Sequence, residues 1–395
     1  MEKQKLSNLV LVQQVDEIAT KLIQLKDQLP TFGLNNGKSG ITLFYCYYAT
    51  FKNDKTYLSV ADDILAECFE NISPKNYTGH NYFRELAEFG IFLEFAQKNQ
   101  WIETEIEPFL SSMDVHLYGY MQKKLAQNNL DVYAGALSSG EYFLNRNGSS
   151  EIAEKALKEL VYSIDKIKEI DAQGGYCWKS SIFNDDRVYT GISHGSAMII
   201  NFLCKVSERK IEEKLCRELV EGAVKFLKQH QGNDDSKALF PNIIGEKRGD
   251  VQLSFCYGDL GTSYSLLRGV KLLNDKGLES EIIQILHHLA QLDSAKFGQI
   301  LDAEITYGAA GVATIFDKIA RTENDILFES YANHWYQKIP QFATYQNETL
   351  GYQAIFNQYS PATNIGFGEG IAGIGIAMMR YVNKKMPPID ELIGL

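Results

Sequence analysis

The stretch QLSFCYGDLGTSYSLL, residues 252–267, holds the pattern that decides the fold. A cysteine and a tyrosine stand directly before Gly-x-x-Gly, and an apolar run with helical spacing follows. The stretch EITYGAAGVATIF, residues 304–316, has the same layout, with Thr306 and Tyr307 before its first glycine. One unit is therefore repeated, and the unit predicts a loop that leads into a buried helix.

Seven copies of this unit can be traced between about residue 34 and about residue 380, spaced roughly 50 to 60 residues apart. In chain order, the first-glycine places are Gly37, Glu85, Gly135, Gly195, Gly258, Gly308 and Gly370. Only eight prolines occur, and helix-period apolar spacing dominates, as in residues 151–170. Each unit has room for one helical hairpin. The sequence therefore predicts an all-α chain in which residues 1–395 form a single domain, an α/α toroid of seven helical hairpins.

The glycines at the helix starts need a physical reason, because glycine costs about 0.5–1 kcal/mol relative to alanine inside a helix. Close approach of two backbones is the usual reason, since a side chain would prevent it. We therefore expect the second helices of the hairpins to crowd together at their starts, as an inner barrel closed into a ring. An open α-solenoid is the alternative, but it would have to cap two exposed apolar ends.

The residues directly before the first glycines would then meet at one mouth of this barrel. They are Asn36, Arg84, Ala134, His194, Tyr257, Tyr307 and Glu369. The set is largely polar, aromatic or ionisable, unlike the apolar runs that follow it. A concave mouth that carries such groups is a candidate active site.

Composition and charge exclude several functions. A formal net charge of −11, without a long run of Lys and Arg, argues against a nucleic-acid surface. The N-terminal residues lack the apolar core of a signal peptide, and the longest apolar stretches are about half of a membrane span. Six cysteines without a C-x-x-C pair indicate reduced thiols. We expect a cytoplasmic protein that does not cross a membrane.

The seven units, together with GISHG (191–195) and CYGDLG (256–261), resemble the lanthionine synthetase C-like cyclases from about Leu34 to Met379. The resemblance implies a toroid of two concentric seven-helix barrels. It also implies an activity, the addition of a peptide cysteine thiol to a dehydroalanine or dehydrobutyrine of the same peptide. In this family zinc lowers the pKa of the thiol, and a general acid protonates the resulting enolate.

The zinc-binding motif of the family is matched only in part. Cys256 matches one zinc ligand, whereas Thr306 and Tyr307 stand where the other two ligands would be. Zinc is therefore not expected, and no other cofactor is implied. Gln252 stands where the family has an arginine. Other residues that carry groups able to bind zinc are Asp302, Glu304, Glu369 and Cys177, but their spacing aims none of them at Cys256.

The proton-transfer residues of the family are matched. His194 corresponds to the histidine proposed as acid or base, Asp131 to an aspartate four places before the third glycine, and Tyr257 to the tyrosine after the zinc cysteine. Two interpretations of Asp131 stay open and are compatible: it caps the following helix, or it orients His194. The expected catalytic residues are His194, Asp131 and Tyr257.

Three functions remain open. The first is a zinc-independent peptide cyclase that forms lanthionine-type thioether rings in a precursor peptide, with a dehydratase and an exporter as implied partners. The second is a non-catalytic, peptide-binding scaffold of a modification complex. The third is a toroidal glycoside-active enzyme with two carboxylates at the scissile bond; seven units and only three tryptophans count against it.

Overall fold

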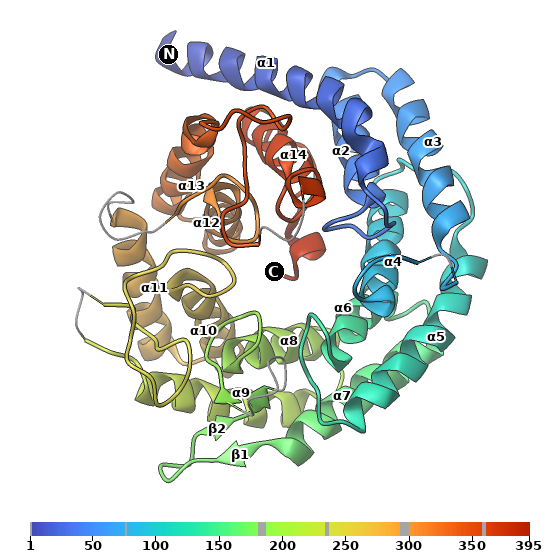
Figure 1. The fold of residues 1–395 in the computed structure, drawn as a ribbon. Helices are drawn as coiled ribbons and strands as arrows, with labels where there is room; N and C mark the ends of the chain where they lie inside the picture. Colours follow the sequence, from blue (N-terminus) through green and yellow to red (C-terminus); the bar gives the residue numbers. More distant parts are fainter. Residues whose placement is uncertain (1, 76, 181–186, 234–236, 293–299, 358–360) are drawn as a thin grey trace. The chain divides into compact units, whose positions relative to one another are not determined.

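The computed structural model describes residues 2–75, 77–180, 187–233, 237–292, 300–357 and 361–395, and their regular secondary structure is almost entirely helical (Figure 1). The strands within these ranges are four two-residue segments: Glu169–Ile170 (β1), Tyr176–Cys177 (β2), Lys179–Ser180 (β3) and Arg187–Val188 (β4). They form two antiparallel pairs, β1 with β2 and β3 with β4. The all-α prediction is therefore confirmed for the described residues.

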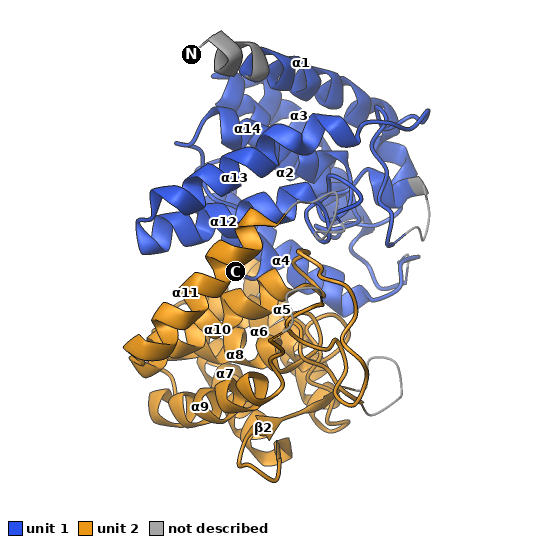
Figure 2. Cartoon of the chain, turned by 90° about the vertical axis from the view of Figure 1, so that its left-hand side faces the viewer, with its two compact units in different colours: residues 1–105, 300–395 blue, residues 106–299 orange. Residues whose placement is uncertain are grey.

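The chain divides into two compact units, residues 1–105 with 300–395 (unit 1) and residues 106–299 (unit 2) (Figure 2). Unit 1 contains α1 (Glu2–Leu25), α2 (Lys38–Lys52), α3 (Thr56–Asn71), α4 (Tyr82–Lys98), α12 (Ala309–Glu323), α13 (Ile326–Lys338) and α14 (Ile371–Val382). It also contains the short 3-10 helices η1 (Lys26–Gln28), η3 (Ile339–Phe342), η4 (Pro361–Asn364) and η5 (Asp390–Ile393). Unit 2 contains α5 (Glu107–Leu125), α6 (Ala136–Arg146), α7 (Glu151–Ile167), α8 (Ser196–Glu208), α9 (Glu213–Gln229), α10 (Asp259–Leu273) and α11 (Lys276–Gln291). A single domain over residues 1–395 stays a prediction.

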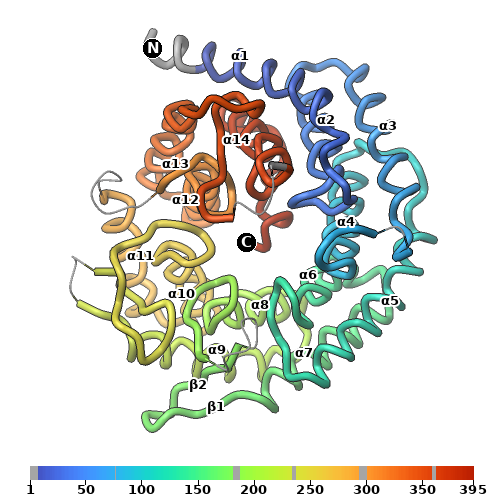
Figure 3. Tube along the Cα trace, viewed as in Figure 1, coloured from blue at the N-terminus to red at the C-terminus, as the bar shows by residue number. Residues whose placement is uncertain are grey.

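Each unit is built from a row of helices with further helices packed against it. In unit 2, α6, α8 and α10 lie side by side, and α5, α7, α9 and α11 pack along this row (Figure 3). In unit 1 the row is α12, α14, α2 and α4, and α13, α1 and α3 pack along it. Consecutive helices thus pair as hairpins, as the repeat predicts.

The burial of the helices follows from their sequences. The row helix α8 is buried along almost its whole length, from Ser196 to Ser207, because apolar and small residues surround its axis. The packed helix α7 buries only a stripe. The stripe consists of Ala153, Ala156, Leu157, Leu160, Val161 and Ile164. This is the i, i+3, i+4 spacing of an amphipathic helix, which has one solvent-exposed face. Among the described residues, no helix is long and apolar enough to span a membrane.

The segments that end at a first glycine share one conformation. We call residues 31–37, 129–135, 189–195, 252–258, 302–308 and 364–370 the leading loops. In five of them the first residue of the following helix donates its backbone N–H to the carbonyl seven positions earlier. The pairs are Lys38 with Thr31, Ala136 with Asn129, Ser196 with Tyr189, Asp259 with Gln252, and Ala309 with Asp302. This bond folds each loop back over the start of its helix.

The way each loop folds back explains why glycine is needed at the end of the loop. A Cβ atom on Gly135 would lie 2.4 Å from the backbone nitrogen of Asp131, and one on Gly195 would lie 2.3 Å from the carbonyl oxygen of Tyr189. Alanine at either place would force the loop away from the helix. The predicted close approach at the helix starts is therefore present, but the nearby backbone is that of the preceding loop and not that of a neighbouring helix.

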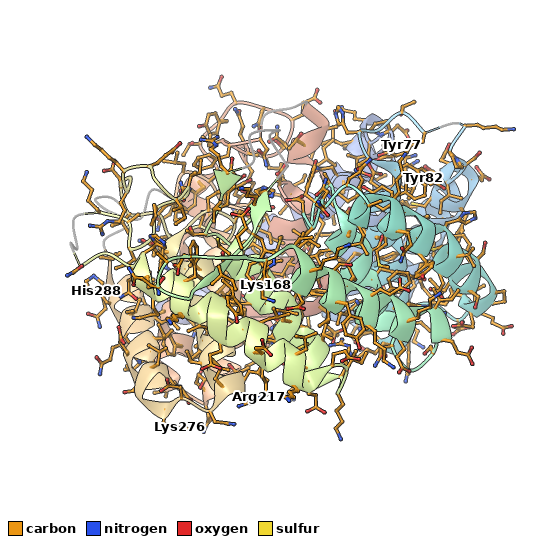
Figure 4. The ribbon with its side chains drawn as sticks, turned by 90° about the horizontal axis from the view of Figure 1, so that it is seen from below. Tyr77, Tyr82, Lys168, Arg217, Lys276 and His288 are labelled. Carbon is orange, nitrogen blue, oxygen red and sulfur yellow. The ribbon has the colours of Figure 1, made fainter. Side chains whose placement is uncertain are left out.

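The second repeat departs from this pattern. Helix α4 begins at Tyr82, because the side chain of Asn81 accepts the backbone N–H of Arg84 at 3.2 Å and caps the helix. Tyr77 and Tyr82 (Figure 4) pack edge to face before this start, with ring centroids 5.3 Å apart. Glu85, which occupies the first-glycine place in the sequence, therefore lies inside the helix.

Neighbouring leading loops bond to each other inside each unit. In unit 2, Ser193 Oγ donates to the carbonyl oxygen of Cys256 at 2.8 Å. In unit 1, Thr306 N–H donates to the carbonyl of Gly368 at 3.2 Å, and Gly368 N–H donates to the carbonyl of Asn35 at 3.1 Å. The loops of successive repeats are thus held against one another, as the prediction of a common mouth requires within each unit.

Candidate active site

The structure brings His194 and Asp131 into direct contact in unit 2. His194 is the next-to-last residue of the leading loop of α8, and Asp131 lies in the leading loop of α6. The ring atom Nδ1 of His194 lies 2.5 Å from Oδ2 of Asp131, and the two side chains are 11% and 1% exposed. A carboxylate on one ring nitrogen fixes the tautomer of an imidazole, so that proton exchange takes place at the other nitrogen.

Asp131 also organises its own loop. Its Oδ1 accepts the backbone N–H of Tyr133 at 2.7 Å and that of Ala134 at 2.8 Å. Its backbone N–H donates to Oδ1 of Asn129 at 3.1 Å. Of the two interpretations left open by the sequence, the contact with His194 is present. The helix cap is not, because α6 has Gly135 at its N-cap and no side-chain cap hydrogen bond, and Asp131 instead holds the loop before the helix.

Two tyrosines pack against the ring of His194. The ring of Tyr257 lies 5.6 Å away at an interplanar angle of 45°, and the ring of Tyr189 lies 6.5 Å away, edge-on. Tyr257 is among the residues that the sequence selects. Tyr189 is not, and only its register, six places before the first glycine, could have placed it in the leading loop. The imidazole thus lies in an aromatic environment that fixes its plane.

Cys256 lies in the adjacent leading loop and is 9% exposed. Its carbonyl accepts the hydroxyl of Ser193, and a Cβ atom on Gly191 would approach the same carbonyl to 3.0 Å. The loop of Cys256 and Tyr257 is therefore packed against the loop of His194. The four residues His194, Asp131, Tyr257 and Cys256 belong to one unit and to three successive repeats.

Thr306 and Tyr307 belong to unit 1, and the contacts described for them lie within that unit. Thr306 Oγ1 donates to the carbonyl of Gly368 at 3.1 Å. The backbone N–H groups of Thr306 and Tyr307 both donate to the carboxyl group of Glu304. The ring of Tyr307 packs on Phe356 with centroids 5.2 Å apart.

The residues at the three zinc-ligand places do not fit zinc. Zinc in proteins is bound by thiolate, imidazole and carboxylate groups, whereas Thr306 and Tyr307 offer hydroxyl groups. Within the described ranges, no group of three or more His, Cys, Asp or Glu side chains is arranged to hold a metal ion. Cys177 lies on β2, outside the leading loops, and burial raises the pKa of its thiol to about 11.

The acidic residues of the sixth and seventh repeats form a buried cluster in unit 1. Asp302, Glu304 and Glu369 are 3%, 1% and 8% exposed. Burial raises the pKa of Asp302 to about 6 and that of Glu369 to about 7. Burial, with Asp302 and Glu369 nearby, raises the pKa of Glu304 well above its usual range. The sequence marked all three as groups able to bind zinc and Glu369 also as a mouth residue, but spacing gave no signal that Asp302 and Glu304 would be buried beside it.

A shallow hollow of about 450 Å³ lies elsewhere in unit 2, on α9 and α11. It is lined by Lys228, Gln231 and His288, among others, and His288 lies at the surface (Figure 4). It contains none of the residues that the sequence selects. The candidate active site therefore consists of the leading-loop residues and not of this hollow.

Comparison with known proteins shows the family and the fold of the chain. A model of the family "Lanthionine synthetase C-like protein" matches residues 31–392. None of the curated proteins matches the sequence. Among solved structures, nisin cyclase is similar over 97% of this chain and 96% of its own, with a TM-score of 0.77 and 15% sequence identity. This likeness confirms the predicted fold class, an all-α fold of the α/α-toroid type.

Proposed function

Because the chain belongs to the lanthionine synthetase C-like family, we propose that it closes thioether rings in a peptide without the help of zinc. The reaction adds a cysteine thiol of the peptide to a dehydroalanine or dehydrobutyrine of the same peptide. A precursor peptide is then the substrate, and a dehydratase and an exporter are the expected partners. Such a role agrees with the cytoplasmic location that the sequence predicts.

The contact between His194 and Asp131 is the observation that carries this proposal. An imidazole 2.5 Å from a buried carboxylate is built to accept a proton, because the carboxylate stabilises the imidazolium. The pair lies in leading loops that also hold Tyr257 beside the ring. A protein that only binds a peptide has no need of such a pair.

The chemistry requires one proton to be taken and returned. His194 accepts the proton of the peptide thiol, and the thiolate sulfur forms a bond to the β-carbon of the dehydroamino acid. The electron pair of the carbon–carbon double bond moves toward the neighbouring carbonyl and gives an enolate. The imidazolium then donates its proton to the α-carbon. No atom is gained or lost, so the mass of the peptide is unchanged.

Zinc independence is supported by the side chains at the sixth repeat. Without a metal to lower the pKa of the thiol, the rate must come from the base and from positioning. Holding the thiol and the double bond of one peptide in a reactive geometry can supply several kcal/mol of the barrier. Thr306 and Tyr307 add no metal-binding group to Cys256.

The test uses the purified protein and a dehydrated peptide that contains cysteine. We expect loss of free thiol at unchanged peptide mass, and a rate lowered roughly 10²–10⁴-fold by His194→Ala. His288→Ala is the matched control, because this exposed histidine lies on α11 outside the leading loops. Equal ring formation with and without the protein would contradict the proposal.

Metal analysis tests the zinc-independent form of the proposal. We expect purified protein to contain far less than one zinc per chain, and ring formation to be unchanged by a chelator. Stoichiometric zinc whose removal abolishes the activity would show that the site is completed by residues other than Thr306 and Tyr307.

The second candidate is a non-catalytic scaffold that binds the precursor peptide. Thr306 and Tyr307 stand where the family has two zinc ligands, and this favours the scaffold. A protein that only binds the peptide does not need zinc, so the loss of the ligands would not impair it. The two candidates differ in the effect of His194→Ala. A scaffold would bind the peptide and form no rings, whether or not His194 is present.

A further inference from the structure

Asp259 carries a buried carboxyl group at a position where other repeats have none. It is the first residue of α10, directly after Gly258, and is 3% exposed. The equivalent residues in other repeats are Lys38, Ala136, Ser196, Ala309 and Ile371, so no carboxylate is required there. A buried carboxylate is costly unless it is hydrogen-bonded, and its partners therefore indicate its role.

The partners of Asp259 lie in residues 238–244, which we call the strap. Oδ2 accepts the backbone N–H of Leu239 at 2.9 Å, and Oδ1 accepts that of Phe240 at 3.1 Å. The carboxylate thereby anchors one edge of the strap to the helix start that follows Cys256 and Tyr257. Hydrogen bonds to an ionised acceptor are stronger than neutral ones.

The other edge of the strap is bonded to the loop of His194. Thr190 Oγ1 donates to the carbonyl of Pro241 at 2.6 Å, and Thr190 N–H donates to the carbonyl of Asn242 at 3.2 Å. Ile244 N–H donates to the carbonyl of Val188 at 2.9 Å. Val188 directly precedes the leading loop that contains His194, and Thr190 is the second residue of this loop. The strap therefore links Asp259 to the histidine loop.

We infer that Asp259 is a positioning residue of the acid–base site, which acts through the strap to hold the loop of His194 in place. The catalytic consequence rests on the proposed function, but the mechanical link does not. Asp259 touches neither His194 nor Asp131 through the bonds described, so its effect passes through Leu239, Phe240 and Thr190.

The ionisation of Asp259 gives this link a pH dependence. Burial raises the pKa of Asp259 to about 6, although the N–H groups of Leu239 and Phe240 and the guanidinium of Arg248 oppose the rise. Arg248 itself donates to the carbonyl of Ala238, at the beginning of the strap, at 3.1 Å. Protonation replaces one acceptor oxygen by a donor, so the strap is fully anchored well above pH 6 and is loosened as the pH falls through about 6.

The experiment compares Asp259→Asn with Asp250→Asn in the full chain. Asn is nearly isosteric but presents an amide N–H to one of the two strap N–H groups. Asp250 is the control, because its exposed side chain bonds Lys237 on the same segment. Three quantities are measured: amide hydrogen exchange of residues 238–244, the NMR shifts of the His194 ring, and kcat and KM for ring formation.

For Asp259→Asn we expect about tenfold faster exchange at Leu239 and Phe240, shifted His194 ring signals, and a kcat lowered about tenfold with little change in KM. For Asp250→Asn we expect none of these changes. Faster exchange with unchanged His194 signals would overturn the inference, because the strap would then be only structural. Unchanged exchange would overturn it as well.

Thr190→Val tests the same link from the other edge if Asp259→Asn fails to fold. It removes the hydroxyl that donates to Pro241, and the same shift of the His194 signals is expected. Unshifted His194 signals in Thr190→Val would count against the inference. If the natural protein forms no rings, the proposed function fails, but amide exchange and the His194 signals still decide whether Asp259 positions this loop.

Discussion

An acidic side chain four places before the first glycine holds the loop in two repeats. Asp131 accepts the N–H groups of the residues two and three places later, and Glu304 does the same with Thr306 and Tyr307. These bonds are therefore a local structural device and do not by themselves mark a catalytic residue. What distinguishes Asp131 is its second oxygen, which faces an imidazole, whereas Glu304 lies near two further carboxyl groups.

Asp131→Asn should separate these two tasks. The amide oxygen of Asn can still accept the loop N–H groups, but the amide nitrogen would face Nδ1 of His194 and favour the wrong tautomer. We expect ring formation to slow roughly 10²–10⁴-fold with a change in unfolding free energy of under about 1 kcal/mol. Peptide cyclisation rates and urea denaturation of the same preparation measure both quantities.

Asp131→Ala is the companion variant. It removes the loop bonds as well, so we expect the same loss of rate together with a stability loss of about 1–2 kcal/mol. A rate for Asp131→Asn equal to that of the natural protein would show that Asp131 only holds its loop.

The sequence predicts some of these residues and misses others for a physical reason. His194 stands directly before a first glycine, so the repeat selects it, whereas Asp131 is selected by the family resemblance, with its contact to His194 as one of two open interpretations. Asp259 stands beside a glycine too, but its partners Leu239 and Phe240 lie in an irregular segment without helical periodicity. No spacing rule relates such a segment to a helix start, and the strap was therefore not predicted.

At the scale of the elements, a glycine predicts where most row helices begin, but a helix can also begin without one. The row helices α6, α8 and α10 begin directly after Gly135, Gly195 and Gly258, as the repeat predicts. Helix α4 begins at Tyr82, because a side-chain cap at Asn81 replaces the glycine turn. Caps of this kind are visible in a sequence only as single polar residues, which are common elsewhere as well.

Helices α5 and α6 are joined by a buried ion pair that sequence patterns do not reveal. Arg146 and Asp114 are 1% and 3% exposed and lie 3.1 Å apart, and Tyr142 also donates to Asp114 at 2.6 Å. Asp114→Ala removes the buried carboxylate from the guanidinium, which still pairs with the half-exposed Glu107. We expect a loss of about 3–5 kcal/mol in unfolding free energy, measured by chemical denaturation.

Glu154→Ala is the control for this prediction. Glu154 pairs with Lys158 on the solvent-exposed face of α7, and both side chains are largely exposed. We expect a change of under about 0.5 kcal/mol. A similarly small change for Asp114→Ala would mean that Arg146 is satisfied by its other contacts.

At the scale of the whole molecule, the repeat predicted the number and order of the helices but not the chemistry between the leading loops. In unit 2 the loops of successive repeats meet through an imidazole and a carboxylate. In unit 1 they meet through backbone bonds and a cluster of carboxyl groups, Asp302, Glu304 and Glu369. The repeat determines the positions of these side chains in the leading loops. The residue type at each position determines whether the contact between two loops involves charged groups.

The carboxyl cluster predicts how stability depends on pH. Burial raises the pKa of Glu369 to about 7, against about 4.3 in an unfolded chain. A carboxyl group with a raised pKa contributes stability that is fully present below its unfolded pKa and is lost as the pH rises through its folded pKa. We therefore expect the free energy of unfolding to fall between about pH 4 and about pH 7, with roughly 3 kcal/mol from Glu369.

Glu369→Gln should remove the share of this dependence that comes from Glu369, while Asp302 and Glu304 keep theirs. Oε1 of Glu369 accepts the side-chain amide of Asn357, while Oε2 has no hydrogen-bond partner among the described residues, so Gln can keep the first contact and place its amide nitrogen at the second position. We expect a gain of roughly 3 kcal/mol at about pH 8 and almost none at about pH 4. Urea denaturation at both pH values measures it, with the exposed Glu329→Gln in the same unit as control. An equal gain at both pH values would show that the effect comes from packing and not from ionisation.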